Sequence, residues 1–334
     1  MNKAISTLLC STALLASAAV HAQDDELSAA VVFDMGGKFD RSFNEGVYNG
    51  VERFREETGI EYMEFEVTNE TQRVQALRRM AREGADIVIS VGFAQAPALE
   101  EVAQEFPDTK FTIIDAQVDL PNVQSVLFKD HEGSFLVGVL AAMASETGSV
   151  GFVGGMDVPL IRNFACGYEQ GAKHADPDIQ IFENMTGTTP AAWNDPGRGA
   201  ELARSQFDRG ADVVFAAAGG TGIGVYQAAE DTGNLAIGVD SNQNYLHPGT
   251  MLTSMLKRVD VAAYEAFKGV QEGTWEPGFQ YLGLAENGVG WALDEHNEEL
   301  ITDEMKAAVE EAKQKIVAGE VEVDSYVDNN ACDY

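Results

Sequence analysis

Side chains able to bind a small molecule gather in a loop early in the sequence. Residues 29–33 are apolar and lead into Asp34, and the loop then runs to Phe43 and Asn44. An aromatic ring offers a stacking face, while a carboxylate and an amide offer hydrogen bonds to a polar ring edge or to hydroxyl groups. We therefore expect Asp34, Phe43 and Asn44 to bind a ligand.

The same loop also has a purely structural interpretation. Ser42 is a residue type that caps helices, Asp34 and Asp40 fit solvated loop acids, and Phe43 fits a packing residue at a helix start. Position favours binding, because the loop joins the end of an expected strand to the start of an expected helix, where open parallel sheets bind ligands.

A second candidate segment lies past the middle of the chain. Trp193 precedes an expected helix, and residues 218–224 read AGGTGIG after an apolar run. These glycines fit neither G-x-G-x-x-G nor the phosphate loop G-x-x-x-x-G-K. We expect instead that Gly219 and Gly220 let the backbone come close to a ligand, and we expect no cofactor.

Patterns for catalysis are weak in this sequence. It contains no G-x-S-x-G motif, and its histidines form no pair with metal-binding spacing. Four histidines follow residue 22, and they are scattered: His131, His174, His247 and His296. We therefore expect a binding protein and not an enzyme.

Composition limits the partners of the chain. Its 334 residues include 22 Lys and Arg against 54 Asp and Glu, which gives a formal charge of −32. Such a charge opposes binding to nucleic acid or to an anionic membrane surface. The length fits two domains, and 45% hydrophobic residues is typical of globular proteins.

The first residues predict export. Residues 1–22 have a charged start, a short apolar run and a small-residue end, which is typical of a secretory signal peptide, and we expect cleavage after Ala22. Cys10 suggests a lipid-anchored alternative, but Leu9 before it is not the small residue that such cleavage needs. We expect a periplasmic protein without a lipid anchor.

Two internal repeats predict the fold. Short apolar runs alternate with helical patterns, which is typical of parallel sheets covered on both faces. Residues 83–88 match residues 209–214, and in the same register the run that ends at Asp115 matches the run that ends at Asp240. The chain therefore looks like two copies of one doubly wound α/β unit, with each aspartate at a ligand-binding strand end.

We expect these units to form two lobes joined by a hinge of several strands, which can close over a ligand. The expected first lobe contains residues 24–146 and about 252–285. The expected second lobe contains residues 147–251 and about 286–334.

A combination of segments resembles a known family. The segments are Asp34 with residues 40–44, and residues 219–222, 238–243 and 252–260. Together, over about residues 28–320, they are similar to the basic membrane protein family. Its members are substrate-binding components of ABC importers with the type I periplasmic binding protein fold, and the best understood bind purine nucleosides. The missing lipid-attachment cysteine is a departure from the family.

The resemblance implies a role for each candidate residue on the base side of the ligand. Phe43 would stack on the base, and Trp193 would close the stack from its other face. Asp34, Asn44 and Asp115 would bind the polar edge of the base or the sugar.

The resemblance also implies how the sugar is held. Asp240 and Lys257 would bind ribose hydroxyl groups, beside the backbone of Gly219 and Gly220. The partners it implies are a nucleoside and the membrane permease and ATPase subunits of an importer, and we expect a monomer.

Charge favours a nucleoside over a nucleotide. The three aspartates of this site face one lysine, so a phosphate would meet net negative charge at short range. Rival ligands of the same fold are a sugar, riboflavin or another small heterocycle. A purely sensory role stays open, and a more distant alternative is a nucleoside hydrolase with aspartates around a calcium ion.

Two cysteines remain after the expected cleavage. Cys166 and Cys332 fit no metal motif, and in an oxidising compartment we expect them to form a disulfide that ties the C-terminal tail to the body. The alternative is a buried thiol and a loose C-terminal thiol.

Overall fold

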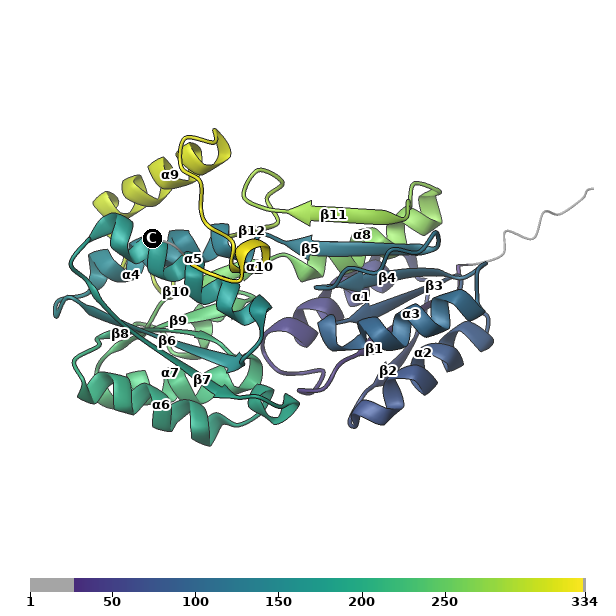
Figure 1. Cartoon of the computed structure of the whole chain (residues 1–334), viewed down its shortest axis with the longest axis horizontal. Coiled ribbons are helices and arrows are strands. Elements are labelled where there is room, and N and C mark those ends of the chain that lie inside the picture. The colour runs from purple at the N-terminus through teal and green to yellow at the C-terminus, as the bar shows by residue number, and fades with distance from the viewer. Residues whose placement is uncertain (1–26, 333–334) are drawn as a thin grey trace, which may run out of the picture.

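Two lobes lie side by side, each built on a six-stranded sheet (Figure 1). The computed structural model describes residues 27–332. The expected signal peptide, residues 1–22 with Cys10, lies outside the described residues.

The first lobe has a fully parallel sheet covered by helices on both faces. Its elements are β1 (Ala29–Phe33), α1 (Phe43–Thr58), β2 (Tyr62–Glu66), η1 (Glu70–Gln72), α2 (Arg73–Arg82), β3 (Ile87–Val91), η2 (Phe93–Gln95), α3 (Ala96–Glu105), β4 (Lys110–Ile114), β5 (Val123–Phe128), α8 (Val259–Glu272) and β11 (Gly278–Leu282). The strand order is β11-β5-β4-β3-β1-β2. Helices α1 and α8 cover one face, and α2 and α3 cover the other.

The second lobe repeats this plan with one antiparallel edge strand. Its elements are α4 (Asp130–Ala144), β6 (Ser149–Met156), α5 (Pro159–Ala175), β7 (Gln180–Gly187), η3 (Pro190–Trp193), α6 (Pro196–Asp208), β8 (Val213–Ala217), η4 (Gly219–Thr221), α7 (Gly222–Thr232), β9 (Leu235–Asp240), η5 (Asn244–Leu246), β10 (Met251–Lys257), β12 (Val289–Trp291), α9 (Asp303–Val317) and α10 (Tyr326–Asn329). The order is β12-β10-β9-β8-β6-β7, with β12 antiparallel to β10. Helices α4 and α5 cover one face, and α6 and α7 cover the other.

Local sequence explains the strands and the turns before them. Strands β1 and β8 are apolar, β3 is apolar except for Ser90, and all three are fully buried, as expected of strands covered on both faces. Gly84 and Gly210 precede β3 and β8 with φ of 90° and 107°. Because glycine adopts such left-handed angles without steric cost, the repeated glycine has a structural reason. The α/β fold class with two doubly wound lobes is confirmed.

Within residues 27–332 the chain crosses between the lobes three times, after β5, β10 and β11. The lobe boundaries differ from the expected ones. Helix α4 packs against α5, β10 and β12, so residues 130–144 belong to the second lobe and not to the first. Strand β10 pairs with β9, so of the expected returning segment 252–285 only the part from α8 to β11 lies in the first lobe.

A physical reason explains why α4 was assigned to the wrong lobe. Helix α4 is buried on nearly all sides. Its sequence therefore has no polar stripe that would indicate which side faces solvent and which lobe the helix packs against. Its partner is set by close backbone approach, because a Cβ at Gly138 would lie 2.1 Å from the carbonyl oxygen of Tyr168 in α5. Such long-range contacts leave no local mark in the sequence.

The apolar core is continuous across the two lobes. One cluster of buried side chains includes β1, α1 and α8 of the first lobe with α4, α5 and β6 of the second. Two further clusters lie under α2 and α3 and under α6 and α7. In residues 27–332 none of the helices combines the length and the apolar character that a membrane span requires.

Candidate functional site

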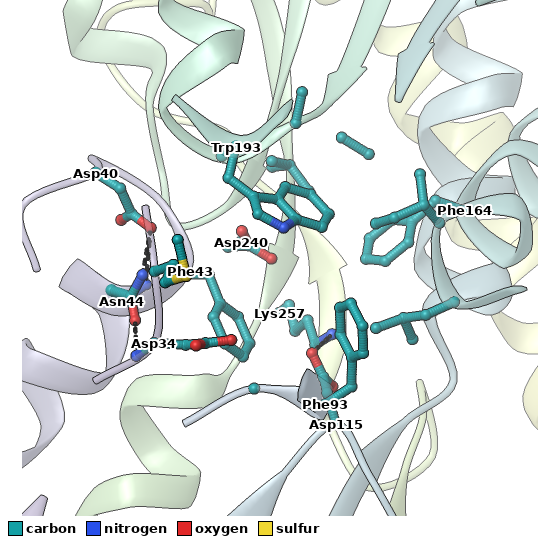
Figure 2. Close-up of a pocket in the computed structure, with 18 residues that line it drawn as sticks. Asp34, Asp40, Phe43, Asn44, Phe93, Asp115, Phe164, Trp193, Asp240 and Lys257 are labelled. Atoms are coloured by element: carbon teal, nitrogen blue, oxygen red, sulfur yellow. Dashed lines mark hydrogen bonds and ion pairs between the residues drawn. The ribbon is translucent and has the colours of Figure 1, made fainter. Parts of the chain in front are cut away.

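A pocket lies between the lobes, beside the carboxyl ends of β1, β3, β4, β8 and β9 (Figure 2). Four aromatic side chains contribute to its apolar wall. The aromatic lining side chains are Phe43, Phe93, Phe164 and Trp193, the first two from the first lobe and the last two from the second. Their rings face a common space in which the carboxylate of Asp240 is also seen (Figure 2).

Asp40 fixes the loop that carries Phe43. Its carboxylate accepts hydrogen bonds from the backbone N–H groups of Ser42, Asn44 and Glu45 at 2.8, 3.1 and 3.1 Å. Asp40 is 7% exposed, and Ser42 makes no capping hydrogen bond. The interpretation of Asp40 as a solvated acid and of Ser42 as the helix cap is therefore wrong, because Asp40 itself caps α1.

Asp34 is held in place from behind the pocket. Its Oδ1 accepts from Nε and Nη2 of Arg73, both at 3.1 Å, and its backbone N–H donates to Asn44 Oδ1 at 3.3 Å. Burial raises the pKa of Asp34, and Arg73 offsets part of that effect. A Cβ at Gly92 would lie 3.3 Å from Oδ2, so the glycine leaves this second oxygen room.

Lys257 lies at the centre of a buried ionic group. Its Nζ is 2.7 Å from Asp115 Oδ2 and 3.1 Å from Asp130 Oδ1, and its side chain is 2% exposed. The rings of Phe128 and Phe164 have their centroids 5.1 and 5.3 Å from Nζ. Ion pairs and cation–π contacts together hold this ammonium group in one position.

Carboxylates outnumber the ammonium group in this buried region. Burial raises the pKa of Asp130, and it raises the pKa of Asp240 to about 6 although Lys257 opposes the shift. Burial alone lowers the pKa of Lys257, but Asp115, Asp130 and Asp240 together raise it above its ordinary value. The site is therefore rich in hydrogen-bond acceptors and carries excess negative charge.

Asp240 also connects the two lobes. Its Oδ2 accepts a hydrogen bond from Ser42 Oγ in the first lobe. Asp240 is 9% exposed and ends β9 of the second lobe. The hydroxyl group of Ser42 thus uses one lone pair of the Asp240 carboxylate. The remaining lone pairs can accept hydrogen bonds from a ligand in the pocket.

Glycines make room for Trp193. A Cβ at Gly155 in β6 would lie 2.2 Å from Cζ3 of the indole ring. Cβ atoms at Gly219 and Gly220 would lie 3.4 and 3.3 Å from the carbonyl oxygen of Trp193. The glycine pair therefore packs against the backbone of η3, and through it supports the indole ring.

Eight of the nine residues that the sequence predicted to bind a ligand line the pocket. The predicted residues that line the pocket are Asp34, Phe43, Asn44, Asp115, Trp193, Gly219, Asp240 and Lys257. The structure does not bring Gly220 into the wall, since it packs beside Trp193 and Asn194. Sequence reasoning missed Phe93 and Phe164 in the wall and Asp130 and Arg73 behind it.

A group of side chains of metal-binding types lies outside the pocket. Among the described residues, Asp294, Glu295 and His296 place ligand atoms within 4.8 Å of one another. Asp294 already accepts from the side chains of Asn242 and Asn244. Glu295 is exposed, and Asp294 and His296 are half-buried.

The C-terminal tail is joined to α5. Cys166 and Cys332 are linked by a disulfide, with 5.8 Å between their Cα atoms. Gln170 donates to the carbonyl oxygen of Asp324 at 3.0 Å, and the N–H of Asp324 donates back to Gln170 Oε1 at 2.8 Å. The tail thus rests on the helix that brings Phe164 to the pocket.

The chain matches a known protein family over nearly all of its described residues. A family model described as "ABC transporter substrate-binding protein PnrA-like" matches residues 27–326. The chain belongs to this family. The match confirms the resemblance to the basic membrane proteins, and it makes the chain an ABC transporter substrate-binding protein.

Relatives of the PnrA-like family differ in how they are named. The ABC transporter nucleoside-binding protein BmpA of Lactococcus lactis is 30% identical over 323 residues, which cover 90% of each chain. An uncharacterized lipoprotein of Pyrococcus horikoshii is 36% identical over 289 residues, 81% of this chain and 70% of that one.

Solved structures agree on the fold. A solute-binding protein of an ABC transporter system from Aeropyrum pernix K1 is 31% identical, with a TM-score of 0.83 over 90% of this chain and 93% of that one. A transcriptional activator of the comK gene from Bacillus halodurans, 23% identical, has a TM-score of 0.75 over 88% and 99% of the two chains. The second likeness concerns the fold alone.

Proposed function

We propose that this protein is exported and binds a purine nucleoside between its lobes for uptake by an ABC importer. The observation that carries the proposal is the pocket lining, where aromatic rings and surplus buried carboxylates surround one space. Aromatic faces suit a flat base, and carboxylate oxygens accept hydrogen bonds from ribose hydroxyl groups. The name of the relative BmpA gives further support.

The base would lie between aromatic rings of opposite lobes. Phe43 is on the first lobe and Trp193 on the second, so closing the lobes brings a stacking face to each side of the base. Asp34 Oδ2 would accept from an N–H on the base edge, because Oδ1 is occupied by Arg73. Asn44 would add a hydrogen bond beside it.

The sugar would lie toward the buried ionic group. Asp240 would accept from ribose hydroxyl groups, and Lys257, held by Asp115, would donate to a sugar oxygen. The backbone of Gly219, which also lines the pocket, would lie beside the sugar. Each hydrogen bond to a charged group contributes about 1.5–3 kcal/mol to binding.

Charge argues against a nucleotide as the ligand. Asp34 is balanced by Arg73, but Asp115, Asp130 and Asp240 share one Lys257. A phosphate group would therefore approach surplus negative charge at low local dielectric. A neutral nucleoside avoids this repulsion and still supplies hydroxyl donors.

Calorimetric titration of the purified protein tests the ligand class. We expect binding of inosine, guanosine or adenosine, and weaker or absent binding of inosine 5′-monophosphate, ribose and riboflavin. Binding of a pentose or riboflavin without binding of any purine nucleoside would show that the pocket serves a rival ligand. A thermal shift with the same panel provides an independent readout.

A nucleoside hydrolase is the rival from another class. Such an enzyme gathers several carboxylates around one calcium ion. Here Asp115 and Asp130 both face Lys257, and Asp34 faces Arg73, so a cation already occupies the position where an ion would bind. We therefore expect no hypoxanthine to form when the protein is incubated with inosine, with or without calcium; release of the base would support the hydrolase.

We further propose that the protein acts as a periplasmic monomer after cleavage behind Ala22. A membrane permease and an ATPase would then receive the nucleoside. Because the Pyrococcus horikoshii relative is named a lipoprotein, the absence of a lipid on Cys10 needs its own test. Intact mass of the exported protein should match a chain that begins at residue 23, whereas a diacylglycerol-sized mass increase on Cys10 would establish the anchor.

A further inference from the structure

A hydrogen-bonded contact joins the lobes outside the pocket lining. The carbonyl oxygen of Arg41 in the first lobe accepts from Gln243 Nε2 at 2.8 Å and from Ser241 Oγ at 3.0 Å in the second lobe. Arg41, Ser241 and Gln243 are absent from the wall of the pocket. We call these three residues the interlobe contact.

Gln243 is fixed from within the second lobe. Its side chain is fully buried, and its Oε1 accepts from the backbone N–H of Val239 at 2.7 Å and from the hydroxyl group of Tyr226 at 2.8 Å. Its own backbone N–H donates to Ser254 Oγ at 2.9 Å. The orientation of the amide is therefore set, and Nε2 is directed at the first lobe.

Arg41 is equally fixed from within the first lobe. Its φ of 63° is left-handed, a strained conformation for a residue other than glycine. The backbone N–H of Arg41 donates to Glu45 Oε2 at 3.1 Å, and Asp40 holds the N–H groups that follow. This strained turn aims the Arg41 carbonyl at the second lobe.

The contact is next to residues that would touch a ligand. Arg41 lies two residues before Phe43, and Gln243 lies three residues after Asp240. Separating the lobes would break both hydrogen bonds to the Arg41 carbonyl and move Phe43 away from Trp193. Closure and completion of the pocket are thus one movement.

We propose that Gln243 and the Arg41 carbonyl form a latch that holds the lobes together and sets the rate of ligand release without touching the ligand. The proposal rests on the proposed function only in requiring a ligand that is enclosed between the lobes. Gln243 is a positioning residue in this scheme, and it acts through the loop that carries Phe43 and Asn44.

Gln243→Glu is the most selective test. The substitution keeps an acceptor for Val239 and Tyr226 but replaces the donor that faces the Arg41 carbonyl with a carboxylate oxygen, which repels it. We expect the dissociation rate of inosine to rise about ten-fold. Ser241→Ala removes the second donor without altering the core, and we expect a smaller rise.

A matched control is available in the second lobe. Gln206 is also fully buried, and its Nε2 donates to Phe152 O and Asn184 Oδ1 within that lobe. Gln206→Glu makes the same chemical change without touching the first lobe. We expect it to lower the melting temperature while leaving the inosine dissociation rate unchanged.

Distances between spin labels at the exposed residues Glu66 and Thr188, one on each lobe, give a readout that does not need a nucleoside. Without added ligand, Gln243→Glu should shift the distribution of label-to-label distances toward longer values. The unsubstituted protein and Gln206→Glu should both keep the shorter distances.

A folded Gln243→Glu protein with unchanged distances and an unchanged inosine dissociation rate would overturn the latch. Failure of the unsubstituted protein to bind any nucleoside would overturn the proposed function instead, and the distance measurement would still decide the latch.

Discussion

Asp115 and Asp240 occupy equivalent positions in the two lobes and both act on Lys257. Asp115 follows β4 with φ of 70°, and Asp240 ends β9 with φ of 65°. Left-handed angles are uncommon outside glycine, but aspartate tolerates them. The internal repeat of the sequence therefore places two carboxylates on opposite sides of the cleft, where each raises the pKa of one buried lysine.

Removing the lysine should destabilise the protein strongly. Lys257→Met leaves Asp115, Asp130 and Asp240 buried without their cation, and breaking such a pair typically costs about 3–5 kcal/mol. Urea unfolding should show this loss, and Asp130→Asn added to Lys257→Met should recover part of it. A loss below about 1 kcal/mol for Lys257→Met would contradict the central role of this ammonium group.

Stability should depend on pH through Asp240. Its pKa is about 6 in the folded protein against an ordinary value of 3.8. As the pH rises from about 4 to about 6, the unfolded chain releases this proton while the folded chain keeps it, so the contribution of Asp240 to the free energy of unfolding falls.

Asp240→Asn isolates that contribution because asparagine does not ionise. Between about pH 4 and pH 6, the free energy of unfolding of the unsubstituted protein should fall, relative to that of the variant, by up to about 1.4 kcal/mol per pH unit. Urea unfolding at several pH values, without ligand, measures the difference. A difference that is constant with pH would mean that Asp240 titrates near its ordinary value.

Substitutions at Phe43 and at Asp240 should affect the binding of a nucleoside and the binding of its free base differently. Stacking of an aromatic ring on a base contributes about 1–3 kcal/mol. Phe43→Ala should therefore lower the affinities for inosine and for hypoxanthine about ten- to hundred-fold each. Asp240→Ala should lower the affinity for inosine more than the affinity for hypoxanthine, because hypoxanthine has no sugar to which Asp240 could bind. Calorimetric titration of both variants gives the comparison, and equal losses in the Asp240 variant would place the sugar at the other end of the pocket.

The sequence predicted pocket residues best where they follow strands. Asp34, Asp115 and Asp240 come directly after apolar runs or end them, and strand ends of a parallel sheet meet at one edge. Phe93 follows β3 by two residues and could have been found by the same rule, whereas Phe164 carries no such mark. Phe164 lies within the helical pattern of α5, where an aromatic residue is expected to pack in the core.

Asp130 and Arg73 show a second limit. Asp130 is fully buried, and its charge is balanced by Lys257 from a distant segment of the same lobe. Arg73 in turn forms an ion pair with Asp34. A buried charge requires a partner, but its identity depends on the three-dimensional arrangement and not on spacing in the sequence. The lobe assignment of α4 and β10 was missed for the same reason.

The Cys166–Cys332 disulfide should be present in the exported protein. We expect Cys166 and Cys332 to resist alkylation in the non-reduced protein and to react after reduction. In the loop-entropy model a bridge across 166 residues contributes about 5 kcal/mol at most. Cys332→Ser should therefore lower the free energy of unfolding measured in urea, and two reactive thiols in the non-reduced protein would refute the bridge.

Gly155→Ala should weaken ligand binding although Gly155 touches no ligand. The added Cβ would lie 2.2 Å from Trp193 Cζ3, a distance that forces the indole ring to move, whereas a Cβ at Gly187 of the neighbouring strand would meet Ala192 at an ordinary 3.6 Å. We expect Gly155→Ala to lower the inosine affinity about ten-fold and Gly187→Ala to leave it unchanged. Calorimetry with both variants tests this, and equal affinities would show that Trp193 is not a stacking residue.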